Sequence, residues 1–265
     1  MKEQYYSQHG EDFLLNKVFN KTDGFFVEVG CIDGRRFSNT LFFEEQGWKG
    51  ICIEAHSDYI ERIKTNRPGS EVVHCAIGEK DEGVVTFYAN ARGSLSSLDK
   101  STEERWKRDY KQYFSGFEEQ KVEKRTLSSV FDQLKIQQID FISIDIEGYE
   151  VEALQGLDLL KHKPTIILIE SDSDEHKQGI EKKLLPAGYQ LILDFGGNLY
   201  YSIDPNLKNS ITDKIFENVR LVHTKHHLDE GGDKELIINI DTRAVTKAPT
   251  QKSFWNNLKD VFKGK

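Results

Sequence analysis

The sequence predicts an α/β fold in which a mostly parallel, doubly wound sheet is covered by helices. From residue 25 to residue 203, short apolar runs alternate with stretches of helical spacing. The run at 25–29 ends in a glycine turn. In sheets of this kind, such a turn brings the backbone close to a nucleotide-like ligand. The run at 139–145 is nearly all apolar, as a central strand should be. A glycine turn between 189–194 and 198–203 predicts an antiparallel edge hairpin.

The first half of the chain contains three strand–helix units. A polar stretch leads into an apolar helix at 13–19, and Glu11 is placed to stabilise its amino end. Gly47 and the Pro68–Gly69 pair then end the two helices that follow. Strands are expected at 25–29, 51–53 and 71–76, and helices at 39–46 and 57–65.

The second half adds the remaining strands and a charged, aromatic segment. Residues 101–120 are expected to be a helical insertion, because its aromatic side chains recur at near-helical spacing. These aromatics either pack onto the domain or line a substrate cleft, where Trp106, Tyr110 and Tyr113 would stack on a base or sugar face. Strands are expected at 84–88, 139–145, 164–169, 189–194 and 198–203, and helices at 128–134, 148–160 and 174–185.

The pattern divides the chain into one domain, 1–204, and a C-terminal extension, 205–265. The extension has one convincing strand, 235–240, and ends in an amphipathic helix at 254–262. We expect this helix to dock on its own domain or on a second copy of the chain, as in a homo-oligomer. Peripheral contact with a membrane is the alternative.

Composition narrows the class of protein. There are 44 acidic against 36 basic residues, a net charge of −8, and no long basic run, which argues against a nucleic-acid substrate. The N-terminus has no apolar signal core and no run reaches membrane-spanning length, so a cytoplasmic protein is predicted. The three cysteines lack metal-ligand spacing and are expected to be buried thiols.

The glycine turn predicts the cofactor. Gly30 and Gly34 stand four apart and Glu28 lies inside the strand, which is not the dinucleotide spacing and points to S-adenosylmethionine rather than NAD. Glu54 ends the second strand, where an acid accepts both ribose hydroxyls of a nucleoside. Ala76, after the third strand, is small and apolar and suits an adenine face.

Carboxylates close the next two strands and predict the chemistry. Asp145 and Glu147 follow the central strand, and Glu170 and Asp172 follow its neighbour, so all should meet at one edge of the sheet. In methyl transfer from S-adenosylmethionine, a hydroxyl group that accepts the methyl is a poor nucleophile, so it needs a general base or a metal that lowers its pKa. Asp145, Glu170 and Asp172 would suit Mg²⁺ or Mn²⁺, whereas Asp145, Glu170 and His56, in that order, are candidate bases. The alternative is that Asp145 binds the methionine part of the cofactor and that Glu170 only caps its strand.

The exit of the central strand favours an oxygen acceptor. Many methyltransferases that act on amino groups of nucleic acids have an Asn/Asp-Pro-Pro-aromatic turn there. This chain has Asp-Ile-Glu-Gly at 145–148 instead.

Several segments together, spread over residues 5–203, resemble the FkbM family of methyltransferases by their order and spacing. They are Ser7-Gln8-x-Gly10-Glu11-Asp12, Phe26-Val27-Glu28-Val29-Gly30-x-x-x-Gly34, Ser38-Asn39-Thr40, Gly47-Trp48-x-Gly50-Ile51-x-Ile53-Glu54 and Ile142-x-Ile144-Asp145-Ile146-Glu147-Gly148-x-Glu150. The resemblance implies a Rossmann-like class I methyltransferase fold and S-adenosylmethionine-dependent O-methylation, commonly of a sugar hydroxyl or a natural-product alcohol. By position it makes Gln8 and Asp12 a lid, Glu28, Gly30, Asn39 and Glu54 cofactor contacts, and Asp145 a residue of the methyl-transfer point.

The sequence therefore predicts an O-methyltransferase that acts on a small-molecule carbohydrate. A nucleotide-linked sugar used for capsule or other glycan synthesis is the expected acceptor, and a natural-product alcohol is an alternative. A non-catalytic, cofactor-binding partner subunit is a second reading, against which the strand-end carboxylates argue. A dinucleotide-dependent oxidoreductase is a third, and the missing third glycine counts against it.

Overall fold

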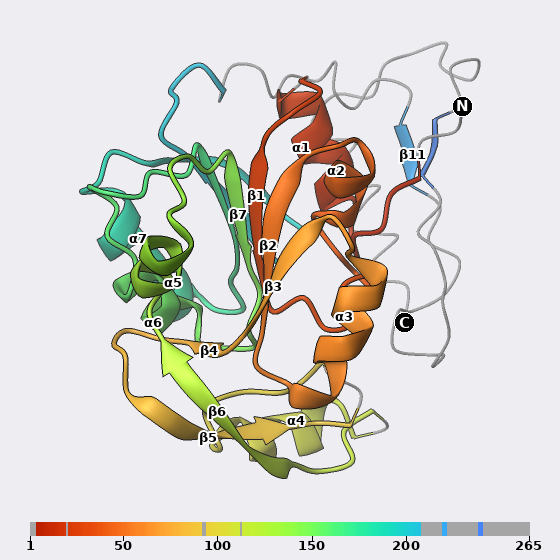
Figure 1. Ribbon diagram of the computed structural model, residues 1–265, viewed down its shortest axis with the longest axis vertical. Helices are drawn as coiled ribbons and strands as arrows, with labels where there is room; N and C mark the ends of the chain where they lie inside the picture. Colours follow the sequence, from red (N-terminus) through yellow and green to blue (C-terminus); the bar gives the residue numbers. More distant parts are fainter. Residues whose placement is uncertain are drawn as a thin grey trace.

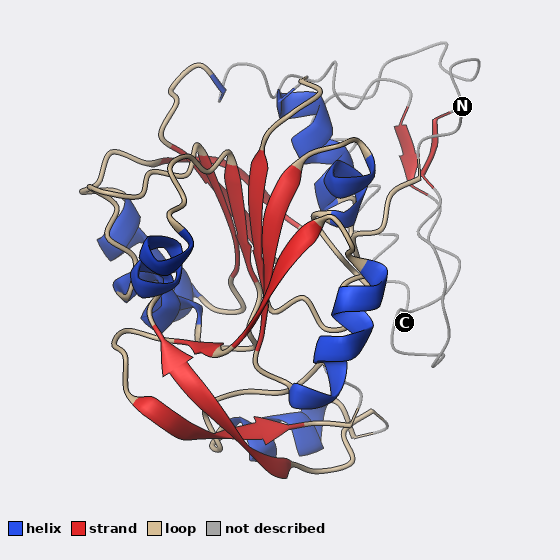
Figure 2. Cartoon of the chain, in the orientation of Figure 1, coloured by secondary structure: helices blue, strands red, loops and turns tan. Residues whose placement is uncertain are grey.

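The computed structural model describes residues 4–19, 21–91, 94–111, 113–207, 219–221 and 238–240. Its centre is a seven-stranded sheet with helices on both faces (Figure 1). A smaller sheet lies at one end of the central one (Figure 2). This arrangement confirms the predicted α/β class with a mostly parallel, doubly wound sheet.

The strand order of the central sheet is β3-β2-β1-β7-β8-β10-β9. Its strands are β1 (Phe25–Val29), β2 (Lys49–Glu54), β3 (Ser70–His74), β7 (Phe141–Ile144), β8 (Ile166–Glu170), β9 (Gln190–Phe195) and β10 (Asn198–Ser202). Neighbouring strands are parallel except that β10 runs antiparallel to both β8 and β9. The predicted hairpin is therefore present, but the antiparallel strand, β10, is second from the edge of the sheet, and β9 is the edge strand. Because β1 lies between β2 and β7, the chain order reverses at its carboxyl end, where such sheets bind ligands.

Alternation along the strands builds a separate core on each face. Val27 and Val29 pack with the helices α5 (Leu127–Leu134), α6 (Glu150–Gln155) and α7 (Asp174–Leu184) on one side. Phe26 and Phe141 face the other side, where α1 (Glu11–Phe19), α2 (Leu41–Glu45) and α3 (Ile60–Asn66) lie, the last preceded by a 3₁₀ turn, Ser57–Tyr59 (Figure 1). Burial of both faces explains why the central strands are continuous apolar runs.

The small sheet differs from the prediction. It has the order β4-β6-β5, formed by β4 (Ala76–Ile77), β5 (Gly83–Ala89) and β6 (Glu118–Arg125). The single strand expected at 71–76 is split between β3 and β4, and the end of the expected helical insertion belongs to β6. Within the insertion the helix is α4 (Thr102–Asp109). The charged sequence of β6 hid its strand character, because only Val122 and Lys124 are buried.

The C-terminal extension is described at two short strands. β11 (Val219–Leu221) and β12 (Ile238–Ile240) pair antiparallel, so the strand expected at 235–240 is found at its end. The predicted helix at 254–262 lies outside the described residues. None of the described helices is long and apolar enough to cross a membrane. The domain boundary at 204 stays a prediction.

Candidate functional site

A cavity of about 230 Å³ lies at the carboxyl ends of β1, β2, β7 and β8. Many of the predicted site residues line it: Gln8, Glu28, Gly30, Asn39, Glu54, Ala76, Asp145, Glu147 and Glu170. Four others, Asp12, Gly34, His56 and Asp172, lie outside its lining. The strand ends thus bring together side chains that are more than a hundred residues apart in sequence.

The glycine turn joins three strands at the floor of the cavity. Gly30 has φ +82°, a conformation that favours glycine. Its N–H donates to the carbonyl of Ile53 over 3.0 Å, and the N–H of Asp145 donates to Val29 over 3.1 Å. A Cβ atom at Gly30 would lie 1.8 Å from the carbonyl oxygen of Asp145. Gly30 is therefore needed for the close approach of β1 and β7.

Glu54 holds the second strand end. Its Oε2 accepts from the N–H of Ile32 and its Oε1 from the N–H of His56, both over 2.8 Å. Ile32 has φ +49°, which is unusual for a β-branched residue, so this contact holds a strained turn beside the cavity. Burial raises the pKa of Glu54 to about 7, even though these hydrogen bonds act in the opposite direction. The carboxylate has lone pairs left for the hydroxyls of a ribose.

Glu28 has a second role that the sequence did not indicate. Its carboxylate accepts from Ser38 Oγ, the N–H of Asn39, Thr40 Oγ1 and the Nη1 of Arg67. Arg67 is fully buried and also binds Glu44. Glu28 therefore organises the loop that carries Asn39, and its direct contact with a cofactor stays a prediction.

The N-terminal motif reaches the cavity through Gln8. Asp12 lies beneath it, where its carboxylate accepts from Ser7 Oγ over 2.5 Å and from the N–H of Tyr6 over 2.6 Å. Burial raises the pKa of Asp12 to about 7. Ser7 also forms a β-bridge with Phe37, another lining residue. Asp12 therefore acts on the cavity by holding the turn that precedes Gln8.

His56 does not fit the role of a base. Its Nε2 lies 3.1 Å from the carbonyl of Asn90, and its Nδ1 accepts from the N–H of Asp58 over 3.4 Å. Burial lowers the pKa of this imidazole. The ring packs against Tyr59 and Phe87 and lies outside the cavity lining. Both ring nitrogens serve the backbone, so this geometry does not support His56 as a base, and its assignment stays a prediction.

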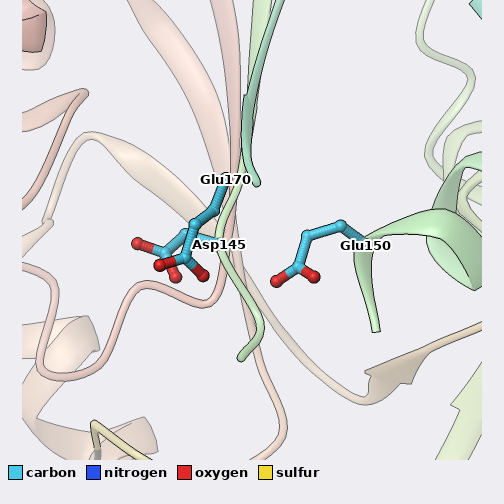
Figure 3. A group of neighbouring side chains, drawn as sticks. All are labelled: Asp145, Glu150 and Glu170. Atoms are coloured by element: carbon cyan, nitrogen blue, oxygen red, sulfur yellow. The ribbon is translucent and has the colours of Figure 1, made fainter. Parts of the chain in front are cut away.

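Asp145 and Glu170 lie side by side at the ends of β7 and β8, with Glu150 facing them from α6 (Figure 3). Carboxylate oxygens of all three residues lie within 4.8 Å of one another. Burial, with repulsion from Glu150, raises the pKa of Asp145 to about 7. Burial, with repulsion from Asp145 and Glu147, raises the pKa of Glu170 well above its usual range. The pair can accept a proton near neutral pH.

The cluster of possible metal ligands in the structure differs from the predicted set by one residue, with Glu150 in place of Asp172. Ligand atoms of Asp145, Glu150 and Glu170 lie within 4.8 Å of one another. Asp172 instead forms an ion pair with Arg105. Glu150 is fully buried and accepts from the N–H groups of Ile146 and Gly148, so its oxygens already hold the loop after β7. Asp145 and Glu170 are the two carboxylates left to bind an ion.

The insertion supplies one wall of the cavity. Tyr110 and Leu95 line it, whereas Trp106 is buried against Phe114 and Phe117. The aromatic segment therefore both packs as a core and contributes one ring to the cleft. Tyr149 and Phe87 also line the cavity, and no sequence motif marked them.

The buried carboxyls predict that the apoprotein loses stability as the pH rises from 6 to 8. Burial raises the pKa of Glu147 to about 8 from an ordinary 4.5, so the folded state binds more protons than the unfolded state in this window. Each such group lowers the free energy of unfolding by up to about 1.4 kcal/mol per pH unit, less where water enters the cavity. Urea unfolding at pH 6, 7 and 8 measures this slope. Glu147→Gln should flatten it, and equal slopes for both proteins would refute the assignment.

The Methyltransferase FkbM domain family matches residues 28–191. Among solved structures, the chain is similar to a precorrin-6y C5,15-methyltransferase from Geobacter metallireducens, with 11% identity, a TM-score of 0.40 and coverage of 72% of this chain and 84% of that one. An O-methyltransferase from Bacillus cereus in complex with SAH shows 13% identity, a TM-score of 0.38 and coverage of 72% and 77%. No curated protein matches the chain in sequence.

The structural likenesses are too distant to carry an argument about activity. The family match is different, because it spans more than half of the 265 residues and includes the glycine turn, Glu54, Asp145 and Glu170. The chain belongs to the FkbM methyltransferase domain family and is an S-adenosylmethionine-dependent methyltransferase.

Proposed function

We propose that the chain transfers the methyl group of S-adenosylmethionine to a hydroxyl oxygen of a sugar. The observation that carries this proposal is the pair of neighbouring carboxyl groups, Asp145 and Glu170, in the lining of the cavity that also includes Gly30 (Figure 3). The new bond forms between the acceptor oxygen and the methyl carbon while the carbon–sulfur bond breaks. A neutral hydroxyl is a poor nucleophile, so its proton must leave as the bond forms.

Asp145 is the proposed base. Glu170 keeps its own proton, because its pKa is raised well above its usual range, so the neighbouring Asp145 can stay an ionised carboxylate. As the new bond forms, the proton of the acceptor hydroxyl passes to Asp145. A base is most effective when its pKa lies near the working pH, and burial brings Asp145 to about 7. Glu147 lines the same side and accepts the N–H of Leu95 over 3.2 Å, so it shapes the wall.

A sugar suits the lining of the acceptor side. Tyr110 offers an aromatic face for the apolar side of a sugar ring, and the carboxyl groups opposite can accept hydrogen bonds from hydroxyls. A phosphate beside Asp145, Glu147 and Glu170 would be repelled. A nucleotide-linked sugar therefore has to bind with its sugar end innermost and its diphosphate directed away from these three residues.

A metal-assisted version uses the same pair. Mg²⁺ commonly takes one or two carboxylates together with water and substrate oxygens, and Asp145 and Glu170 supply two. A bound Mg²⁺ or Mn²⁺ would lower the pKa of the acceptor hydroxyl. Treatment with EDTA separates the versions: unchanged activity supports the base, and loss that Mg²⁺ or Mn²⁺ restores supports the metal.

Mass spectrometry tests the proposed reaction. The protein is incubated with S-adenosylmethionine and a panel of free sugars, sugar phosphates, nucleotide-sugars, amino sugars and simple alcohols. The proposal expects a gain of one methyl group on a sugar, with fragmentation placing it on oxygen. Methylation of nitrogen alone, or of a non-sugar alcohol alone, would contradict it.

A further inference from the structure

The insertion that carries Tyr110 has its own small core. Leu95, Trp106 and Phe114 are buried together, with Tyr113 and Phe117 packed against them. All of these residues belong to the segment between β5 and β6, so this cluster does not by itself hold the segment on the central sheet. A helix as short as α4 needs tertiary contacts to persist.

One ion pair links α4 to the central sheet. Arg105 projects from α4 to Asp172, which lies two residues after β8. The other ion pairs of α4 stay within the helix, such as Lys107 with Glu103 at 2.9 Å. Among the described residues, no other side-chain hydrogen bond or ion pair of α4 reaches the central sheet.

The same ion pair continues into a polar chain around the acceptor side. Asp172 lies 3.5 Å from Nδ1 of His176, and Nε2 of His176 lies 3.2 Å from Glu150. Glu150 in turn accepts the N–H of Gly148 over 3.1 Å, next to Glu147.

Glu147 connects this series of polar contacts back to the segment between β5 and β6. The Glu147 carboxylate accepts from Leu95, and the Glu147 carbonyl accepts from Ser97 Oγ over 3.2 Å. Tyr110, directly after α4, lines the same cavity as Glu147 and Glu170. The position of Tyr110 therefore depends on how α4 is held.

We propose that Arg105 and Asp172 are positioning residues whose ion pair clamps α4 onto the carboxyl end of β8 and fixes Tyr110 in the acceptor wall of the cavity. The clamp rests on the proposed function in one respect only, namely that the wall carrying Tyr110 is the one that contacts the acceptor. We expect it to act on the acceptor side, because within the described part of the chain no hydrogen bond or ion pair joins Arg105 or Asp172 to Glu54 or Gly30.

Hydrogen exchange of the amides of α4 tests the clamp without an acceptor. Arg105→Gln and Asp172→Asn should each speed exchange in Thr102–Asp109 by about fivefold, the upper range for an exposed ion pair. Lys107→Gln, which removes an ion pair internal to the same helix, is the matched control and should have a smaller effect. Arg105→Lys should restore most of the protection.

Coupling and cofactor affinity make the test decisive. The double variant Arg105→Gln/Asp172→Asn should exchange no faster than either single variant, because both remove one interaction. The dissociation constant for S-adenosylhomocysteine should change by less than about twofold. Additive effects, an Arg105→Gln variant that matches Lys107→Gln, or a tenfold loss of cofactor affinity would each overturn the clamp. If the unaltered protein failed to bind S-adenosylhomocysteine, the proposed function would fail while the exchange result still decided the clamp.

Discussion

Gly30→Ala should abolish cofactor binding at the concentrations where the unaltered protein is saturated. The new methyl group would meet the backbone oxygen of Asp145 at 1.8 Å, and backbone cannot move aside as a flexible side chain can. Separating β1 from β7 would distort the floor of the cavity. We expect the affinity for S-adenosylhomocysteine to fall at least about 100-fold, or about 2.7 kcal/mol, and stability to fall by about 3 kcal/mol.

Gly47→Ala is the matched control. Gly47 has φ +96°, yet a Cβ there would meet nothing within 4 Å. Its substitution isolates the cost of the left-handed backbone, about 1–2 kcal/mol of stability, and should leave cofactor affinity unchanged. Calorimetric titration and urea unfolding measure both variants. Equal affinity in Gly30→Ala and Gly47→Ala would show that the close approach of the two strands is unimportant for binding.

Asp145→Asn should lower kcat by about 10²- to 10⁴-fold on the sugar that the mass-spectrometric panel identifies. The amide cannot take up the hydroxyl proton, although it keeps nearly the same shape. Cofactor affinity should change little, because Gly30 and Glu54 keep their contacts.

Asp194→Asn serves as the control for that variant, since Asp194 lies on β9 in an exposed ion pair with Lys177. It should retain normal kcat. An Asp145→Asn protein with normal kcat would remove Asp145 from the reaction and leave Glu170 as the remaining candidate. Loss of S-adenosylhomocysteine binding in the same variant would instead show a role in holding the cofactor.

Much of the central sheet was predictable because its strands are buried on both faces. Runs such as 141–144 and 166–169 are apolar at every or nearly every position, and their carboxyl ends carry the acids that line the cavity. The turn at Gly30 was predictable for a related reason, since glycine there follows directly from a strand.

The remaining features depend on contacts between distant segments, which sequence spacing does not record. Strand β6 consists mostly of charged residues, and only its pairing with β5 makes it a strand. Arg67 meets Glu28 across 39 positions, and Arg105 meets Asp172 across 67. For His56, the sequence shows that an imidazole is present but not that both of its nitrogens are engaged.

Titration of the purified protein with S-adenosylhomocysteine measures whether the cofactor binds in the cavity at the ends of β1, β2 and β7. We expect one site per chain with a dissociation constant on the order of 10 μM, and loss of that binding in Gly30→Ala but not in Gly47→Ala. A folded, unaltered protein that gives no binding up to about 1 mM, or that binds NAD in the same titration, would contradict the account.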